Sequence, residues 1–327
     1  MVDSFRKIPF FLCLIFIING FLQLSAQVDS PAKKQLNSTS INSDSVAYQA
    51  TPYKPKFIAN LPPKINETSA LLFINGQLWT LNDSGNQPEI YSFDSTNGSN
   101  LRTVVISNAV NTDWESMAQD DSNVYIGDFG NNAGNRKDLH ILKIKKTELL
   151  NTASDSVKAG YIYFIYPDQI NFTQALNKNN FDCEAFICHN DSLHLFSKNW
   201  ADLHTKHYVL PADTGKYIAR LAERFNVDGL ITDASINAKG NMVLLGYKNV
   251  KGRRFTCFAW LLKGFEGYEF FGGNKRRLEL GSALHLGQTE GIVLRDDNTG
   301  WLSSESILAG WLMRPAKLFR FDFGGYF

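Results

Sequence analysis

Residues 115–132, ESMAQDDSNVYIGDFGNN, contain the pattern that decides the fold. An acidic residue opens the stretch, and two short apolar segments follow on either side of a polar turn. A loop rich in Gly and Asn ends it. Short β-branched and aromatic runs separated by a polar turn are typical of an antiparallel hairpin. The stretch therefore predicts two adjacent strands that begin at an acidic side chain.

The same pattern occurs five times along the chain. The copies begin at Glu67, Glu115, Glu184, Asp233 and Glu290. A third apolar segment follows every copy, and a fourth follows each of the first four. Four antiparallel strands repeated at a period of roughly fifty residues are typical of a β-propeller.

The last copy has three apolar segments instead of four. Residues 55–61, PKFIANL, precede the first copy and are expected to pair with residues 317–323, KLFRFDF. This pairing would complete the last blade and remove an exposed sheet edge. We therefore predict an all-β protein, a β-propeller of five four-stranded blades closed by an N-terminal strand. Six blades are the alternative, if the long interval 143–182 contains a further blade.

The N-terminal region differs in composition from the repeats. Arg6 and Lys7 precede an apolar run over residues 9–24, and small residues follow, which predicts a signal peptide over residues 1–26. An uncleaved membrane anchor is the alternative. Residues 27–52 are rich in Ser, Asn and Lys and are expected to form a flexible leader before a propeller domain over residues 53–327. We expect an exported protein (secreted, periplasmic or at the cell surface) without a membrane span after cleavage.

Charge and cysteine content further narrow the class of protein to which the chain can belong. Thirty-three basic and 32 acidic side chains nearly balance, so the chain lacks the excess positive charge of a nucleic-acid-binding protein. Cys183, Cys188 and Cys257 follow the predicted signal peptide, and an odd number cannot pair completely, so free thiols are expected. His204 and His207 are interpreted as a surface pair. We expect a monomer that binds an extracellular ligand or protein.

Alternate loops of a propeller blade lie on the same face of the ring. The acidic residue before each first strand and the loop after each second strand therefore share a face, with the acids near the central channel. Carboxylates about 6 Å apart repel by about 3 kcal/mol per pair at an effective dielectric of about 20, and a bound cation removes this cost. Oxygen ligands without His or Cys favour Ca²⁺. Acceptance of hydrogen bonds from a neighbouring blade is the alternative role of these acids.

The blade starts resemble those of the calcium-activated nucleotidase (apyrase) family, which consists of secreted or lumenal five-bladed propellers with Ca²⁺ in the central tunnel. Ser69, Glu115, Glu184 and Glu290 match the positions at which that family holds the ion, and Thr232 or Asp233 stands at the remaining position. The resemblance implies a Ca²⁺ site formed by these residues. The other residues expected on the ligand-binding face are Glu67, Asp83, Asp128, Lys198, Trp200, Lys248 and Glu305.

Three functions are consistent with this pattern. The first is ligand or partner binding through the loops of this face, around a central Ca²⁺ ion, and it ranks first because no catalytic motif is visible beyond the ring. The second is Ca²⁺-dependent hydrolysis of nucleoside diphosphates or other phosphate esters, as the resemblance implies. The third is a glycosidase that uses a pair of carboxyl groups, because five-bladed propellers also contain such sites.

Overall fold

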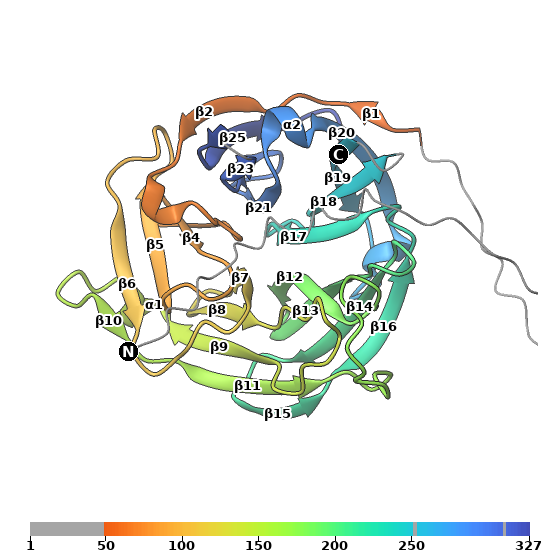
Figure 1. Cartoon of the computed structure of the whole chain (residues 1–327), viewed down its shortest axis with the longest axis horizontal. Coiled ribbons are helices and arrows are strands. Elements are labelled where there is room, and N and C mark those ends of the chain that lie inside the picture. The colour runs from red at the N-terminus through yellow and green to blue at the C-terminus, as the bar shows by residue number, and fades with distance from the viewer. Residues whose placement is uncertain (1–48, 251–253, 310–311) are drawn as a thin grey trace, which may run out of the picture. The chain divides into compact units, whose positions relative to one another are not determined.

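A computed structural model describes residues 49–250, 254–309 and 312–327. Five antiparallel sheets surround a common centre and form a five-bladed β-propeller (Figure 1). The predicted fold class and the preferred number of blades are therefore confirmed. The predicted signal peptide and most of the predicted leader lie outside the described residues.

Each blade has four main strands, which follow one another from the centre of the ring outward in the order given for each blade. Blade 1 contains β3 (Leu72–Ile74), β4 (Gln77–Leu81), β5 (Glu89–Asp94) and β6 (Arg102–Ile106). Blade 2 contains β7 (Trp114–Gln119), β8 (Asn123–Asp128), β9 (His140–Lys145) and β11 (Gly160–Ile165). Blade 3 contains β12 (Asp182–His189), β13 (Ser192–Lys198), β14 (Thr205–Pro211) and β16 (Arg220–Phe225).

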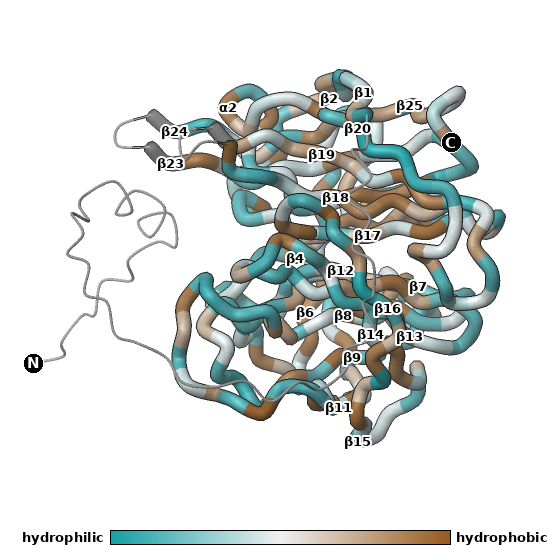
Figure 2. Tube along the Cα trace, turned by 90° about the vertical axis from the view of Figure 1, so that its right-hand side faces the viewer, coloured by the Kyte–Doolittle hydropathy of each residue, from teal (hydrophilic) through white to brown (hydrophobic). Residues whose placement is uncertain are grey.

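Blade 4 contains β17 (Leu230–Ile236), β18 (Met242–Val250), β19 (Arg254–Lys263) and β20 (Asn274–Ser282). Blade 5 contains β21 (Thr289–Leu294), β22 (Thr299–Ser304), β25 (Lys317–Asp322) and β2 (Lys56–Asn60). A short hairpin of β23 (Ile307–Ala309) and β24 (Leu312–Arg314) interrupts this blade and projects from one side of the ring (Figure 2). The helical turns are α1 (Lys146–Leu149), α2 (Ala283–Leu286), η3 (Pro63–Ile65) and η4 (Phe270–Gly272).

The ring closes through the N-terminal strand. β2 pairs antiparallel with β25, and Lys56 lies opposite Arg320, which confirms the predicted pairing of residues 55–61 with 317–323. Just before it, β1 (Thr51–Pro52) pairs in parallel with β20 of blade 4. Thr51 and Pro52, which the sequence analysis assigns to the leader, thus contribute to the sheet of blade 4.

The interval 143–182 does not contain a sixth blade. Its strand β11 completes blade 2, and β10 (Ser156–Val157) adds a fifth strand to blade 1 through parallel pairing with β6. A second parallel addition, β15 (Gly215–Ile218), extends the outer edge of blade 2. The strands of this interval therefore add to the outer edges of the sheets of blades 1 and 2.

Apolar side chains between neighbouring blades form five separate clusters, one at each junction of the ring. At the junction of blades 5 and 1, the rings of Trp301 and Phe73 stack with centroids 4.9 Å apart. Such clusters explain why the inner strands lack the simple alternation of an exposed sheet: both faces of each blade are covered. The ring is thus held by packing all the way round, including the junction that the chain termini close.

Two further expectations can be compared with the structure. Cys183, Cys188 and Cys257 are free, as predicted, and Cys183 and Cys257 are buried. Among the described residues, no helix has the length and apolar character needed to cross a membrane. The predicted monomeric state stays a prediction.

Candidate functional site

Four inner strands contain a β-bulge at the same level of the ring. The extra residue is Glu115 in β7, Glu184 in β12, Thr232 in β17 and Glu290 in β21. A bulge redirects the side chain of the extra residue and often occurs next to functional sites. Thr232 is therefore the structural counterpart of the three glutamates, and Asp233 is one position further along.

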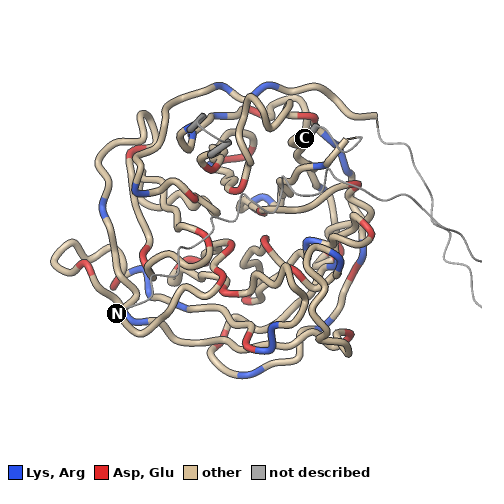
Figure 3. The backbone as a smooth tube through the Cα atoms, in the orientation of Figure 1, with Lys and Arg blue, Asp and Glu red and all other residues tan. Residues whose placement is uncertain are grey.

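Many of the acidic residues lie around the centre of the ring, while many of the Lys and Arg residues lie toward its outside (Figure 3). Glu115, Glu184 and Glu290 are each at most 5% exposed. Burial, followed by repulsion from Asp83 and Glu184, raises the pKa of Glu115 well above its usual value. Burial also raises the pKa of Glu290 to about 7. The predicted shared face of the acids is thus visible in their mutual electrostatic effects.

Three carboxyl groups lie especially close together. Asp83 follows β4, Asp113 precedes β7, and Glu115 is the bulge residue of β7; one carboxylate oxygen from each lies within 4.8 Å of the other two. Glu115 is only 4% exposed, and among the described residues its carboxylate has no hydrogen-bond or ion-pair partner. Burial and repulsion from Asp83 raise the pKa of Asp113 well above its usual value. Three mutually repelling oxygen ligands are the donor set that a hard divalent cation requires.

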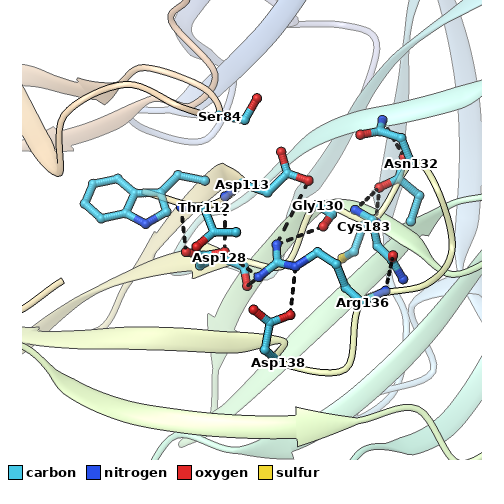
Figure 4. A network of polar contacts seen from close by, with 12 residues as sticks. Ser84, Thr112, Asp113, Asp128, Gly130, Asn132, Arg136, Asp138 and Cys183 are labelled. Atoms are coloured by element: carbon cyan, nitrogen blue, oxygen red, sulfur yellow. Dashed lines mark hydrogen bonds and ion pairs between the residues drawn. The ribbon is translucent and has the colours of Figure 1, made fainter. Parts of the chain in front are cut away.

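Arg136 and Asp128 hold Asp113 in this position (Figure 4). Asp128 is fully buried at the end of β8, and it accepts hydrogen bonds from the backbone amides of Thr112 and Asp113, both at 3.2 Å. Arg136 donates to Asp128 at 2.7 Å and lies 4.0 Å from the carboxylate of Asp113. Asp128, predicted on the ligand-binding face, therefore positions the loop that carries Asp113.

On the blade 3 side of the acidic face, the buried cation is Lys198. It is 3% exposed at the end of β13, forms an ion pair with Glu184, and has its ammonium group 5.0 Å from the ring centroid of Trp200. The indole Nε1 of Trp200 donates a 2.7 Å hydrogen bond to Asp182, the residue opposite Lys198 in the β12–β13 ladder. The structure thus places Glu184, Lys198 and Trp200, all named from the sequence, next to one another and next to Asp182.

Three other predicted ligands use their oxygen atoms between blades. The hydroxyl group of Ser69 donates to the backbone carbonyl of Glu115 at 2.9 Å, and the hydroxyl group of Thr232 donates to that of Thr289 at 2.9 Å. Both carboxylate oxygens of Asp233 accept hydrogen bonds, from Ser116 and from the amide of Ile292. Asp233 therefore has the inter-blade role that the sequence left open as the alternative, and metal binding by Ser69 and Thr232 stays a prediction.

The remaining predicted residues lie around these groups. Glu67 accepts a 2.5 Å hydrogen bond from Asn86. Burial, together with repulsion from Glu67, raises the pKa of Asp83 to about 6. Burial and repulsion from Glu290 raise the pKa of Glu305 well above its usual value. Lys248 instead forms an ion pair with Asp228. Asp113 and Asp182 were not predicted, although each stands two residues before a bulged glutamate.

No protein-family model and no curated protein matches the chain. Among solved structures, an α-L-arabinofuranosidase from Podospora anserina, solved with cellotriose, has a TM-score of 0.44 at 9% identity over 83% of this chain and 98% of its own. A GH43 β-1,3-galactosidase solved with galactodeoxynojirimycin has a TM-score of 0.44 at 10% identity over 78% and 90%. The tail fibre of Staphylococcus aureus phage P68 has a TM-score of 0.43 at 12% identity over 84% and 54%. Likeness at this level says nothing about the ligand of this chain.

Proposed function

We propose that this face of the propeller binds one Ca²⁺ ion through Asp83, Asp113 and Glu115 and uses it to hold an oxygen-rich ligand. The observation that carries the proposal is the approach of three carboxylate oxygens to within 4.8 Å around the buried, unpartnered Glu115. Burying ionised carboxylates without a counterion is costly, and a divalent cation offsets that cost.

The residues present fit Ca²⁺ better than a transition metal. The three ligands come from a loop, a strand start and a bulge, and all of them are carboxylates. Ca²⁺ accepts oxygen ligands in irregular geometry, whereas Zn²⁺ favours His and Cys in a tetrahedron. A bound ion would supply positive charge at the entrance of an otherwise acidic face. Ligands with hydroxyl, carboxylate or phosphate oxygens would then be recognised there.

Calorimetric titration of the full chain with CaCl₂ tests the proposal. The unaltered protein should bind Ca²⁺, and Asp113→Asn should weaken binding at least tenfold because it removes a ligand charge. Asp297→Asn is the matched control, since Asp297 pairs with Lys239 and takes no part in the acidic cluster. Absence of binding by the unaltered protein, or equal loss in both variants, would contradict the proposal. Thermal unfolding in EDTA and in Ca²⁺ gives an independent readout, because a ligand that binds only the folded state raises its stability.

Phosphate-ester hydrolysis, as the nucleotidase resemblance implies, would depend on the same ion. Lys198 is already paired with Glu184, so the acidic face offers little attraction to a phosphate without a bound cation. Screening nucleoside diphosphates with and without Ca²⁺ therefore tests this activity directly. We also propose export of the chain, which the N-terminal sequence predicts.

Glycosidic-bond hydrolysis is the second candidate function, and Glu290 favours it. Its pKa of about 7 is suitable for a general acid. Burial raises the pKa of Glu184 well above its usual value, and attraction to the ammonium group of Lys198 opposes that rise. Glycoside hydrolases require two neighbouring carboxyl groups with different pKa values, one protonated and one ionised, and Lys198 is the group that favours ionisation of Glu184. Aryl glycosides assayed against Glu290→Gln test this function: activity that is unchanged in the variant would exclude Glu290 as the acid.

A further inference from the structure

The central carboxyl groups fall into two sets with different counterions. The first set, Asp83, Asp113 and Glu115, comes from blades 1 and 2, and the guanidinium of Arg136 lies 4.0 Å from Asp113. Attraction to Lys198 also opposes the rise that burial causes in the pKa of Asp83. The second set consists of Asp182, Glu184 and Glu290 from blades 3 and 5, and we name it the blade 3–5 set. The ammonium group of Lys198 lies within this second set. The two sets therefore differ in how closely a cation of the chain approaches: Lys198 donates directly to Glu184, whereas Arg136 lies 4.0 Å from Asp113 and makes its shorter contact with Asp128.

Lys198 is fixed in place from several sides. Its ammonium group donates to Oε2 of Glu184 and lies 5.0 Å and 5.1 Å from the ring centroids of Trp200 and Tyr247. Aromatic faces stabilise a cation that has been removed from water. Burial alone would lower the pKa of Lys198, but attraction to Glu184 and to the other acidic groups raises it well above its usual value. The ion pair with Glu184 and the two aromatic faces therefore hold the ammonium group among the carboxylates of the blade 3–5 set.

We propose that Lys198 is a built-in counterion that takes the place of a second metal ion and limits the face to one Ca²⁺. This inference rests on the proposed function of the first set. The blade 3–5 set supplies the same kind of ligands: Glu184 and Glu290 are bulge residues like Glu115, and all three are nearly fully buried. Removal of the ammonium group would leave these carboxylates without a counterion, which is the condition under which a divalent cation binds.

The consequence for specificity is that the two halves of the face present different charges to a ligand. The half with the first set would offer a metal ion with exchangeable ligand positions. The half with Lys198 would offer a fixed, singly charged group and the half-buried ring of Trp200. A ligand would therefore bind with its most strongly coordinating oxygen on the Ca²⁺ ion, on the side of blades 1 and 2.

Calorimetric stoichiometry of Ca²⁺ binding tests the role of Lys198. The unaltered protein should bind one ion and Lys198→Met should bind two, while Lys198→Met combined with Glu184→Gln should return to one. Lys206→Met is the matched control: Lys206 is also buried, but it pairs with Asp168 at 2.7 Å instead of with a central carboxylate, and it lies 4.1 Å from the ring centroid of Phe181. It should retain one ion.

The outcomes separate this inference from the proposed function. One ion in both the unaltered protein and Lys198→Met would overturn the role of Lys198 and leave the first site in place. No ion in the unaltered protein but one in Lys198→Met would refute the first site and support Lys198. If Lys198→Met folds poorly without metal, thermal unfolding at several Ca²⁺ concentrations gives the same answer, because its stabilisation by Ca²⁺ must then exceed that of the unaltered protein. Equal stabilisation of the two would overturn the inference.

Discussion

The hydroxyl group of Ser116 donates a 2.8 Å hydrogen bond to Asp233, although the two residues lie on inner strands that are not neighbours in the ring. Ser116 belongs to β7 and Asp233 to β17, and β12 lies between them. The second oxygen of Asp233 accepts the amide of Ile292 in β21 at 2.7 Å. Asp233, the residue after the bulge residue Thr232, thus connects three inner strands across the centre of the ring.

Asp233→Ala should therefore destabilise the propeller. The substitution leaves the buried amide of Ile292 and the hydroxyl group of Ser116 without their acceptor, and unsatisfied buried donors cost about 1–3 kcal/mol each. We expect a loss of about 2–4 kcal/mol in the free energy of unfolding, measured by urea denaturation. Asp297→Ala, which removes an exposed ion pair, should cost less than about 1 kcal/mol. Equal effects of the two substitutions would show that Asp233 does not hold the strands together.

Much of the fold was predictable because each copy of the repeat is a contiguous stretch of sequence with the same pattern of strands and turns. Each blade begins with an acidic or polar residue followed by two short apolar strands and a turn, so the strands, their order and the closing pair 55–61 with 317–323 could be read directly. The parallel additions β1, β10 and β15 could not. They are two to four residues long, and their pairing depends on the exposed edge of a finished blade rather than on any pattern of their own.

The site was predictable only in part. The equivalent positions of Glu115, Glu184 and Glu290 follow from the repeat, but the choice between Thr232 and Asp233 depends on the bulge. Asp113 was missed because its position depends on the loop held by Asp128 and Arg136. The prediction of a surface pair for His207 was wrong: His207 is fully buried. Its partners come from β13 and β16, and short-range spacing does not contain that information.

The closing strand gives a second prediction. Deletion of residues 1–60 removes β1 and β2 and leaves the edge of β25 unpaired, together with apolar surface at the junction of blades 5 and 1. Unpaired edges and lost apolar burial should destabilise the ring by several kcal/mol or prevent folding. Deletion of residues 1–48, which removes none of the described strands, is the control. Thermal unfolding by circular dichroism should separate the two variants; identical midpoints would mean that closure contributes little.

A third prediction concerns pH. His194 is fully buried, its Nδ1 lies 2.9 Å from Nε2 of His207, and burial followed by repulsion from His207 lowers its pKa to about 3. A histidine whose pKa is lowered by folding contributes stability that is complete above the unfolded value of about 6.5 and is lost as the pH falls toward 3. Between pH 7.5 and 4.5 this contribution should decrease by roughly 3 kcal/mol.

The His194→Gln variant has no titratable side chain at this position, so it should lose less stability over the same pH interval. Urea denaturation of both proteins at pH 7.5, 5.5 and 4.5 provides the comparison, and the difference between them cancels the opposite effect of the central carboxyl groups. Parallel pH profiles would mean that folding does not lower the pKa of His194.

The last prediction uses Gly130, which lies against the first carboxylate set. A Cβ atom at this position would overlap the carboxylate oxygens Oε1 of Glu115 and Oδ2 of Asp113, and the φ angle of Gly130 is one that alanine adopts without strain. Because both contacts are the ends of side chains, Gly130→Ala should displace the two carboxylates while leaving the backbone hydrogen bonds of Gly130 in place. We expect Ca²⁺ affinity to fall at least tenfold, about 1.4 kcal/mol, while the unfolding midpoint in EDTA stays within a few degrees. Gly272→Ala, whose added Cβ would make only ordinary contacts with Glu269, should change neither quantity. Undiminished Ca²⁺ binding by Gly130→Ala would place the ion elsewhere, because a cation held by Asp113 and Glu115 leaves no room for that methyl group.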